Sequence, residues 1–435
     1  MIFLREYLER ESRCAVALLD DLEWRGLVFQ TTDREALDRR LEEGPITAYI
    51  GFDPTAESLH MGNLVGILML RRFQLAGHHP IAVVGGATGL IGDPSFKSEE
   101  RPLNPVETVH AWRDRIELQL RRFLDFDTPI NPARVVDNYD WTAPIGVIEF
   151  LRDVGKHFSV NVMLNRESVA SRLEAGISYT EFSYMLLQAR DYLELFRQYD
   201  CRLQMGGSDQ WGNIVAGVDL IRRSEGAGAH ALTFPLITKS DGTKYGKTEG
   251  GAIWLDADKM SVFHYYQFWL TAEDADVVSL LKIFTFLSRE EIEDLEASTR
   301  ERPAERRAQR VLAEHVTTLT HGREAMEQAR HLSELLFQGQ VAELSRDEVE
   351  DVFEGVPTVA LGPGAARDIQ SVLVAAGASP SRRQAREDIQ AGAIHVNGTR
   401  LGEVDHVFSD ADLLHGRYLI IRRGRRNYFL ARLGD

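Results

Sequence analysis

The segment from Tyr49 to Asn63, Y-I-G-F-D-P-T-A-E-S-L-H-M-G-N, constrains the fold more than any other part of the chain. An apolar strand runs into a turn containing Gly, Asp and Pro, and His60 and Gly62 then stand where an apolar helix begins. The first N–H groups of a helix have no partner within the helix, and the dipole there is positive. The segment therefore predicts a strand–turn–helix unit that can bind a phosphate at the helix start.

The first half of the chain repeats this alternation of strand and helix patterns. Strands are predicted at Ile46–Phe52, Pro80–Gly86, Ala133–Asp137 and Cys201–Gly206, and helices at Gly62–Ala76, from Pro105 after an Asn104 N-cap, at Tyr179–Tyr199, and to Ser224 after a Ser208 N-cap. Strands separated by helices of ten or more residues indicate parallel βαβ units. We expect a doubly wound parallel sheet, whose ligands bind at the carboxyl ends of the strands.

The second half has a different pattern. From about Asp256 to Gly339 only helices are indicated, one of them beginning with a capping box at Ser288 and Glu291. A Gly/Pro-containing stretch near 356–366 indicates a linker. The segment from Ile369 onward has a mixed α/β pattern.

The composition is typical of a soluble globular protein of two to four domains, with 435 residues, 44% of them hydrophobic. The N-terminus has no apolar signal-peptide core, and no apolar run is long enough to span a bilayer. Two cysteines, Cys14 and Cys201, form neither a disulfide framework nor a C-x-x-C pair. We expect a cytoplasmic protein with no membrane association and no structural zinc site.

The distribution of charge is uneven. The net charge of −16 argues against a nucleic-acid partner, but the segment from Asp368 to the end has ten Arg and eight Asp or Glu, a net of +2. Between Leu413 and Gly434 there are six Arg and no acid. A basic C-terminal segment on an acidic body can still bind RNA.

Two further segments carry cations suited to phosphates. Lys244 and Lys247 lie in a glycine-containing loop, K-S-D-G-T-K-Y-G-K-T, and can reach a polyphosphate. Lys97 and Arg101 follow the Gly-rich turn after the second strand and can hold leaving phosphates. Each segment alone is also compatible with an ordinary solvated loop.

Polar residues also occur at strand ends and along one helix face. Tyr184, Gln188 and Asp191 are spaced to share one face of a mostly apolar helix, either as a pocket wall or as an exposed stripe. Asp209 and Gln210 follow a glycine pair at a strand end, where they can bond a ribose hydroxyl.

In this order, the segments resemble the bacterial tyrosyl-tRNA synthetases over nearly the whole chain. Y-I-G-F-D-P-T-A-E-S-L-H-M-G-N is similar to the HIGH signature of that family, with Asn63 in place of the second His. K-Y-G-K-T is similar to KMSKS, with Tyr245-Gly246 in place of Met-Ser. V-G-G-A-T-G-L-I-G-D-P, T-E-F-S-Y-M-L-L-Q-A and Q-M-G-G-S-D-Q-W-G-N-I fill the intervening pattern. The C-terminal A-G-A-S-P-S-R-R-Q-A-R-E-D-I-Q-A-G-A-I-H-V-N-G resembles an S4 RNA-binding domain.

The resemblance implies a tyrosine–tRNA ligase with a Rossmann-type catalytic domain. It would activate L-tyrosine with ATP, accompanied by Mg²⁺, and then transfer the tyrosyl group to the terminal adenosine of tRNA(Tyr). A homodimer is implied, with no metal or organic cofactor bound by the protein itself. The implied domains are a Rossmann-type catalytic domain at 1–237, a KMSKS-like loop and linker at 238–257, a helical anticodon-side domain at 258–339, a linker at 340–367 and an S4-like domain at 368–435.

The resemblance also assigns roles to single residues. The implied tyrosine-binding residues are Tyr49 and Asp191 for the phenol and Asp93, Tyr184 and Gln188 for the ammonium group. The implied ATP-binding residues are Gly51, Asp53, His60, Gly62, Asn63, Asp209, Gln210, Lys244, Lys247 and Thr248. The implied catalytic residues are Thr55, His60, Asn63, Lys97, Arg101, Lys244 and Lys247, which meet the phosphates. The arginines expected to contact tRNA are Arg382, Arg383, Arg386, Arg422, Arg423, Arg425 and Arg426.

Three alternative functions are compatible with parts of the sequence. Tryptophan activation on the same fold is disfavoured by the Tyr49/Asp191 pair and by the S4-like segment. A non-catalytic RNA-binding paralogue should have lost His60 or the two loop lysines, and this chain retains them. A small-molecule nucleotidyltransferase would leave the C-terminal segment unexplained.

Overall fold

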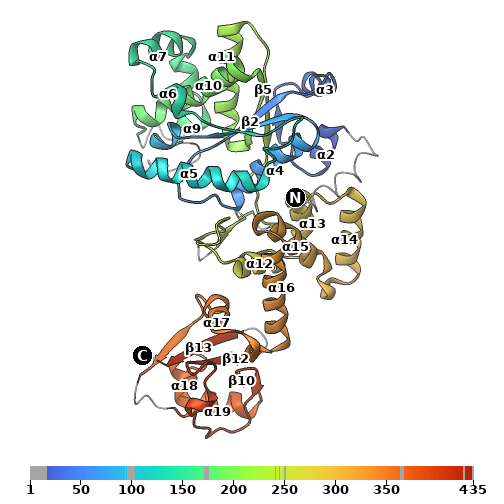
Figure 1. The fold of residues 1–435 in the computed structure, drawn as a ribbon, viewed down its shortest axis with the longest axis vertical. Helices are drawn as coiled ribbons and strands as arrows, with labels where there is room; N and C mark the ends of the chain where they lie inside the picture. Colours follow the sequence, from blue (N-terminus) through green and yellow to red (C-terminus); the bar gives the residue numbers. More distant parts are fainter. Residues whose placement is uncertain are drawn as a thin grey trace. The chain divides into compact units, whose positions relative to one another are not determined.

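The computed structural model describes residues 17–93, 95, 103–170, 176–240, 242–243, 245–248, 251–362, 367–424 and 427–433. The chain forms two compact units (Figure 1). The first comprises Met1–Met260 and Ala272–Thr320, and the second comprises Ser261–Thr271 and His321–Asp435. None of the helices in the described part of the chain has the length and apolar character that a bilayer span requires.

The first unit is built on a six-stranded sheet in the order β1-β6-β5-β2-β3-β4. Its strands are β1 (Gln30–Thr31), β2 (Thr47–Phe52), β3 (His79–Val84), β4 (Arg134–Asp137), β5 (Cys201–Gly207) and β6 (His230–Phe234). All neighbouring strands are parallel except β1, which pairs with β6 in the antiparallel direction. The expected doubly wound parallel sheet is confirmed.

Helices cover both faces of this sheet (Figure 1). α4 (Met61–Leu75) and α5 (Val106–Phe123) pack on one face, and α10 (Tyr179–Tyr199) and α11 (Trp211–Glu225) pack on the other. α4 is buried around most of its circumference, as expected for its apolar sequence. α10 begins at Ser178, whose hydroxyl accepts from the Glu181 N–H, and ends at Asp200 in the left-handed conformation.

The described part of the first unit has further elements. They are α2 (Leu18–Trp24), α3 (Arg34–Glu42), α6 (Tyr139–Thr142), α7 (Val147–Asp153), α8 (Val160–Leu164), α9 (Glu167–Ala170), the hairpin β7 (Lys247–Thr248) and β8 (Gly251–Ala252), α13 (Val277–Phe284), α14 (Arg289–Glu301) and α15 (Arg307–His321). The capping box predicted at Ser288 and Glu291 is present at the start of α14.

The second unit combines helices with a smaller sheet. Its helices are α12 (Val262–Leu270), α16 (Arg323–Gln338), α17 (Arg346–Val352), α18 (Ile369–Ala375) and α19 (Arg382–Gln390). Its strands are β9 (Thr358–Leu361), β10 (Ile394–Val396), β11 (Thr399–Arg400), β12 (Tyr418–Arg423) and β13 (Asn427–Leu433), in the order β11-β10-β12-β13-β9. The segment 340–367, expected to be a linker, contains α17 and β9. The predicted domain boundaries remain predictions.

The structure differs from the sequence prediction at three elements. β6 was not predicted, because its short apolar sequence H-A-L-T-F lacks the alternation that marks a half-buried strand. Ser208 begins a 3₁₀ turn instead of capping α11, whose N-cap is Gln210 without a side-chain bond. Pro105, expected at the first helical position, is itself the N-cap of α5, so the helix begins one residue later than expected.

Candidate active site

The carboxyl ends of β2, β3 and β5 define the candidate site. β3 and β4 are added on one side of β2, and β5 and β6 on the other, so the strand order reverses next to β2. Such a switch point is where doubly wound sheets bind ligands. Gly51, in contrast to its buried neighbours in β2, is exposed there, and a Cβ atom built on it would contact nothing.

A hydrogen-bond network connects the elements that meet at this point. The Tyr184 hydroxyl of α10 donates to Asp53 Oδ2 at 2.6 Å, and the Thr88 hydroxyl donates to Asp53 Oδ1 at 2.6 Å. Asn138 Nδ2 donates both to Thr88 Oγ1 and to Asp191 Oδ2, each at 2.9 Å. The network therefore joins the end of β2, the turn after β3, the end of β4 and helix α10.

Asp191 lies at the buried end of this network and is 4% exposed. Besides the bond from Asn138, its Oδ1 accepts from Trp141 Nε1 at 2.8 Å. Burial raises the pKa of the Asp191 carboxyl to about 7, against the opposite effect of the Asn138 and Trp141 hydrogen bonds. The carboxyl can therefore change its protonation state near neutral pH.

Tyr49 lies on β2 close to this carboxyl. Burial, and next the charge of Asp191, raise the pKa of the Tyr49 hydroxyl well above its usual value. Its ring packs edge-on against Tyr192, with the centroids 5.3 Å apart. Among the described residues the Tyr49 hydroxyl has no hydrogen-bond partner, and neither has Oε1 of Gln204, its neighbour in the β2–β5 register. Buried polar atoms of this kind are rare in folded proteins, and these two can bond a polar group placed beside them.

The remaining polar residues predicted for the substrate line the strand ends. Gln210 Nε2 donates to Asp93 Oδ2 at 2.7 Å, which links the end of β5 to the turn after β3. The Asp209 carboxylate lies over Gly207, where a Cβ atom would collide with it. Gln188 is half-buried and lies on α10 one turn after Tyr184.

The start of α4 is capped by two side chains. His60 is the N-cap, and its Nδ1 accepts from the Gly62 N–H at 3.0 Å, so the proton of the neutral ring lies on Nε2. A Cβ atom on residue 62 would lie 2.8 Å from His60 Cε1, so only glycine leaves room for the imidazole. Asn63 Oδ1 accepts from the His60 N–H at 3.0 Å. The His60 Nε2 proton and the Asn63 amide protons can then be donated to an anion.

The lysine-bearing loop is attached to the same helix start. Ile253 N–H donates to Gly246 O at 3.3 Å, and Met61 N–H donates to Ile253 O at 2.8 Å. Gly246 has φ +82° and lies against the Met61 side chain. Lys247 and Thr248 form β7 in the backbone, and their side chains lie outside the described part. The predicted residues Lys97, Arg101 and Lys244 also lie outside the described residues, whereas Thr55 is exposed in the turn after β2.

The predicted tRNA-contacting arginines of the second unit fall into two groups. Arg382, Arg383 and Arg386 are exposed on the first two turns of α19, each beside an acid. Arg423 is half-buried and is bound by Asp388 at 3.0 Å and by the Ala378 carbonyl. Arg422 is half-buried on β12, and Arg425 and Arg426 lie outside the described residues.

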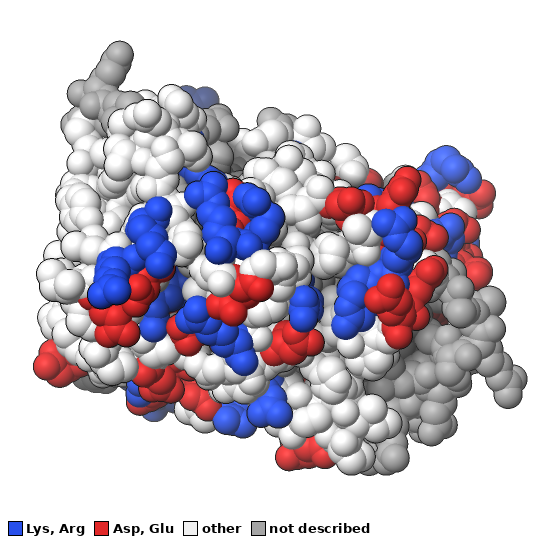
Figure 2. Space-filling view, turned by 90° about the horizontal axis from the view of Figure 1, so that it is seen from above, with Lys and Arg blue, Asp and Glu red and all other residues white. Residues whose placement is uncertain are grey.

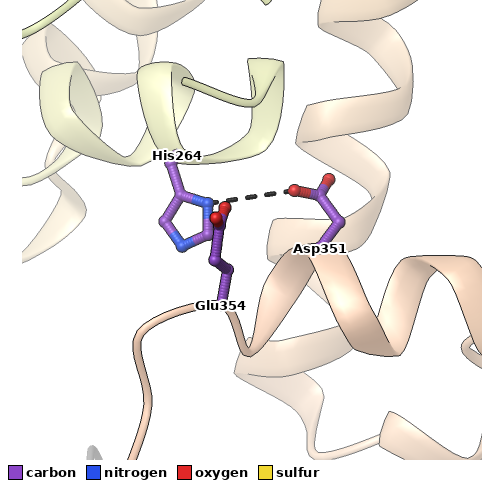
Figure 3. Close-up of side chains that lie close together, drawn as sticks. All are labelled: His264, Asp351 and Glu354. Carbon is purple, nitrogen blue, oxygen red and sulfur yellow. Dashed lines mark ion pairs between the residues drawn. The ribbon is translucent and has the colours of Figure 1, made fainter. Parts of the chain in front are cut away.

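One cluster in the second unit has the composition of a metal site. His264 of α12 lies beside Asp351 and Glu354, with Nδ1 3.9 Å from Asp351 Oδ1 (Figure 3). The ligand atoms of the three residues lie within 4.8 Å of one another. However, His264 Nδ1 is also 2.9 Å from the hydroxyl of Ser261, the N-cap of α12. We interpret the cluster as an ion pair that holds α17 on α12.

Sequence reasoning missed Asn138, Trp141 and Thr88. Asn138 and Trp141 follow β4 directly, in N-Y-D-W, and a polar residue at the carboxyl end of a parallel strand is a signal that could have identified Asn138. Nothing in the sequence indicates that the Trp141 indole reaches a residue 50 positions away.

The chain is similar to several known proteins. Residues 41–338 match the family model of the class I tRNA synthetases (W and Y), and residues 348–431 match the tyrosine–tRNA ligase SYY-like C-terminal domain. The chain is 59% identical to a tyrosine–tRNA ligase of Geobacillus kaustophilus over 95% of this chain and 99% of that protein. It is 55% identical to tyrosine–tRNA ligase 1 of Bacillus subtilis over 95% of this chain and 98% of that protein. A crystal structure of a C-terminally truncated mitochondrial tyrosyl-tRNA synthetase from Aspergillus nidulans superposes with a TM-score of 0.68 at 30% identity, covering 76% of this chain and 97% of that one.

The close packing at Gly85 gives a first test. A Cβ atom there would collide with Asp53 Oδ1 and Thr88 Oγ1, so Gly85→Ala should separate these residues and lower the free energy of unfolding by about 1–3 kcal/mol. Gly51→Ala is the matched control at the end of the neighbouring strand, because its Cβ atom meets nothing, and it should change stability by less than about 0.5 kcal/mol. Urea unfolding of the two variants measures both values. Equal stability of the variants would contradict the role assigned to Gly85.

Proposed function

The chain belongs to the family of class I tRNA synthetases for tryptophan and tyrosine, and from this premise we propose how its residues carry out the reaction. The activity is that of a tyrosine–tRNA ligase: tyrosine and ATP give tyrosyl-adenylate and pyrophosphate, and the tyrosyl group is then transferred to tRNA(Tyr). Because the curated relatives described above are tyrosine ligases, we do not propose tryptophan activation.

The buried hydroxyl of Tyr49 beside Asp191 is the observation on which the site proposal depends. A phenol needs one donor and one acceptor, and a Tyr hydroxyl with an ionised carboxylate supplies both. Phenylalanine would leave the Tyr49 hydroxyl without a partner and would set an apolar ring against the Asp191 carboxylate, which costs free energy. Tyrosyl-tRNA synthetases are themselves the standard example of this selectivity, so only its direction is argued from the two residues.

The other substrate groups are proposed to bind along α10 and the strand ends. The α-ammonium group would lie among Asp93, Tyr184 and Gln188, which offer oxygen acceptors, one of them a carboxylate. ATP would lie along Gly51, Asp53, Gly62, Asp209 and Gln210 on the open side of the strand ends. In this arrangement the substrate carboxylate and the α-phosphate meet between Tyr49 and His60, at the two ends of one βα unit.

The proposed role of the protein in this reaction is to position the substrates and to neutralise charge. The tyrosine carboxylate is already a nucleophile and attacks the α-phosphorus in line, which expels pyrophosphate without a general base. His60 Nε2, the amide of Asn63 and the N–H groups at the start of α4 would donate to the phosphate oxygens as charge develops. Thr55, Lys97, Arg101, Lys244, Lys247 and Thr248 are proposed to contact the β- and γ-phosphates.

Magnesium is proposed to arrive with ATP. Mg²⁺ keeps several waters and is commonly held by phosphates with one or two carboxylates, and it neutralises phosphate charge when bound. Asp53 and Asp93 both offer carboxylate oxygens at the strand ends, but each already accepts hydrogen bonds from neighbouring side chains. These contacts favour an ion held mainly by the nucleotide over an ion held in a protein cage.

Binding of tRNA is proposed to use the second unit. Arg382, Arg383 and Arg386 present guanidinium groups on the exposed side of α19, where they suit phosphate contacts. Arg422, Arg423, Arg425 and Arg426 would add positive charge along the β12–β13 turn. One face of the molecule carries Lys, Arg, Asp and Glu side chains intermixed, so the acidic net charge does not form a single-sign field there (Figure 2).

We place the reaction in the cytoplasm.

A homodimer is proposed from exposed apolar side chains on consecutive elements of the catalytic unit. In the single chain, large apolar side chains are exposed at Val147, Ile148, Leu151, Val160, Val162 and Tyr179. α7, which carries the first three, has no buried residue. Exposed apolar groups concentrated in this way typically mark an interaction surface.

Exchange of labelled pyrophosphate into ATP tests the amino-acid specificity. Wild-type protein should catalyse exchange with tyrosine and not with tryptophan or phenylalanine. Tyr49→Phe should reduce the preference for tyrosine over phenylalanine about fivefold, the value of one neutral hydrogen bond of about 1 kcal/mol. Tyr192→Phe is the matched control, because it removes a hydroxyl from the same cluster that already donates to the His230 carbonyl. Absence of tyrosine-dependent exchange in folded protein would overturn the proposal.

The raised pKa of Asp191 predicts the pH dependence of tyrosine binding. Above about pH 7 the carboxyl is ionised and accepts from the phenol, and below it the protonated carboxyl loses this role. The KM for tyrosine should therefore rise as the pH falls below 7, approaching tenfold per pH unit. Asp191→Asn should remove this dependence, and the KM for ATP in the same assays is the control. A KM for tyrosine that stays constant from pH 6 to 8 would contradict the role of Asp191.

Sedimentation velocity tests the dimer. Ile148→Glu places a charge on the exposed face of α7 and should convert a dimer to monomers at micromolar concentration. Phe337→Glu on α16 is the matched control, because this side chain is 92% exposed outside the proposed interface, and it should remain dimeric. Monomeric wild-type protein, or a dimeric Ile148→Glu variant, would exclude this surface as the interface.

A further inference from the structure

A buried amide on α5 connects the two segments that are proposed to act on the phosphates. Gln119 is 4% exposed, and its Oε1 accepts from the Leu59 N–H at 2.9 Å, directly before His60. Its Nε2 lies 3.3 Å from Ser58 Oγ and 3.4 Å from Asp256 Oδ2. One side chain therefore contacts both the turn that carries His60 and the segment that follows the lysine-bearing loop.

The two segments also pair through their backbones. Met61 N–H donates to Ile253 O at 2.8 Å, Leu255 N–H donates to Leu59 O at 2.9 Å, and His60 and Trp254 form an antiparallel bridge. Ile253 N–H in turn donates to Gly246 O, within the lysine-bearing loop. A shift of segment 253–256 would therefore move Gly246 relative to His60.

Glu57 makes a second connection of the same kind nearer the surface. It accepts from Arg115, one turn before Gln119 on α5, at 2.7 Å, and it also forms an ion pair with Lys259. Helix α5 thus holds segment 57–60 at two successive turns, and each time the contact extends to residues 256–259. We call Glu57, Arg115, Gln119, Asp256 and Lys259 the α5 clasp.

We propose that Gln119 is a positioning residue, which fixes the register of His60 against the lysine-bearing loop and thereby supports the attack on the α-phosphorus. The proposal rests on the proposed function. Both polar groups of the Gln119 amide are needed, because Oε1 accepts from the Leu59 N–H and Nε2 donates to the Asp256 carboxylate. It is directed at the phosphates and not at the phenol pocket, because among the described residues no hydrogen bond joins the clasp to Tyr49, Asn138 or Asp191.

The test exchanges the donor and the acceptor of the Gln119–Asp256 hydrogen bond. Gln119→Glu keeps the acceptor for Leu59 but places a second carboxylate against Asp256, which should push the two segments apart. We expect kcat for tyrosine-dependent pyrophosphate exchange to fall about 10-fold to 100-fold, as for a small misplacement of reacting groups. The KM for tyrosine should stay within about twofold. Adding Asp256→Asn restores a donor–acceptor pair with reversed polarity, and it should recover most of the lost kcat.

The outcomes separate this proposal from a purely structural role and from failure of the function. A normal kcat in Gln119→Glu, or a double variant no better than the single one, would overturn it. So would a parallel loss of kcat, tyrosine affinity and thermal stability, because that pattern indicates general destabilisation. A wild-type protein without exchange activity would overturn the proposed function together with the inference, whereas an active wild type with a fully active Gln119→Glu variant overturns the inference alone.

Discussion

The buried carboxylate of Asp191 is the constraint on which the rest of the proposed tyrosine pocket depends. A charge at this depth is costly unless hydrogen-bond donors surround it, and Asn138 and Trp141 provide them. Asn138 is itself fixed, because its Oδ1 accepts from the Ala87 N–H and its Nδ2 also reaches Thr88. The turn after β3 and the segment after β4 must therefore both be in place before the carboxylate can be buried.

The tyrosine-binding and the phosphate-binding parts of the proposed site recognise groups of different charge. The phenol is neutral, and a pocket selects it by leaving buried polar atoms unpaired when another side chain enters. The phosphates are highly charged, and they are best met by helix N–H groups and cations that remain accessible to a large ligand. Tyr49 in the core and His60 at a partly exposed helix start follow this division, although they belong to one strand–turn–helix unit.

Local patterns predicted a substantial part of the fold and of the site. The limits of α10 were predicted to the residue, and the structure shows Ser178 as its N-cap and Asp200 in the left-handed conformation at its C-cap. The spacing of Tyr184 and Asp191 placed both on one helix face, and their burial shows that this face is not an exposed stripe. β6 and the partners of Asp191 were not predictable in the same way. Their positions depend on pairing and hydrogen bonds between distant segments, which local periodicity does not predict.

The start of α4 shows how stability and catalysis can use the same atoms. Asn63 Oδ1 caps the backbone of His60, while His60 Nδ1 caps the N–H of Gly62, so the two side chains stabilise the helix end reciprocally. This arrangement fixes the imidazole with Nε2 directed away from the cap, and it leaves the protons of the Asn63 amide available. Asn63 can therefore replace the second histidine of the signature, because the position needs an acceptor toward the backbone and a donor toward the ligand. An amide supplies both at every pH, whereas an imidazole supplies both only in its neutral form.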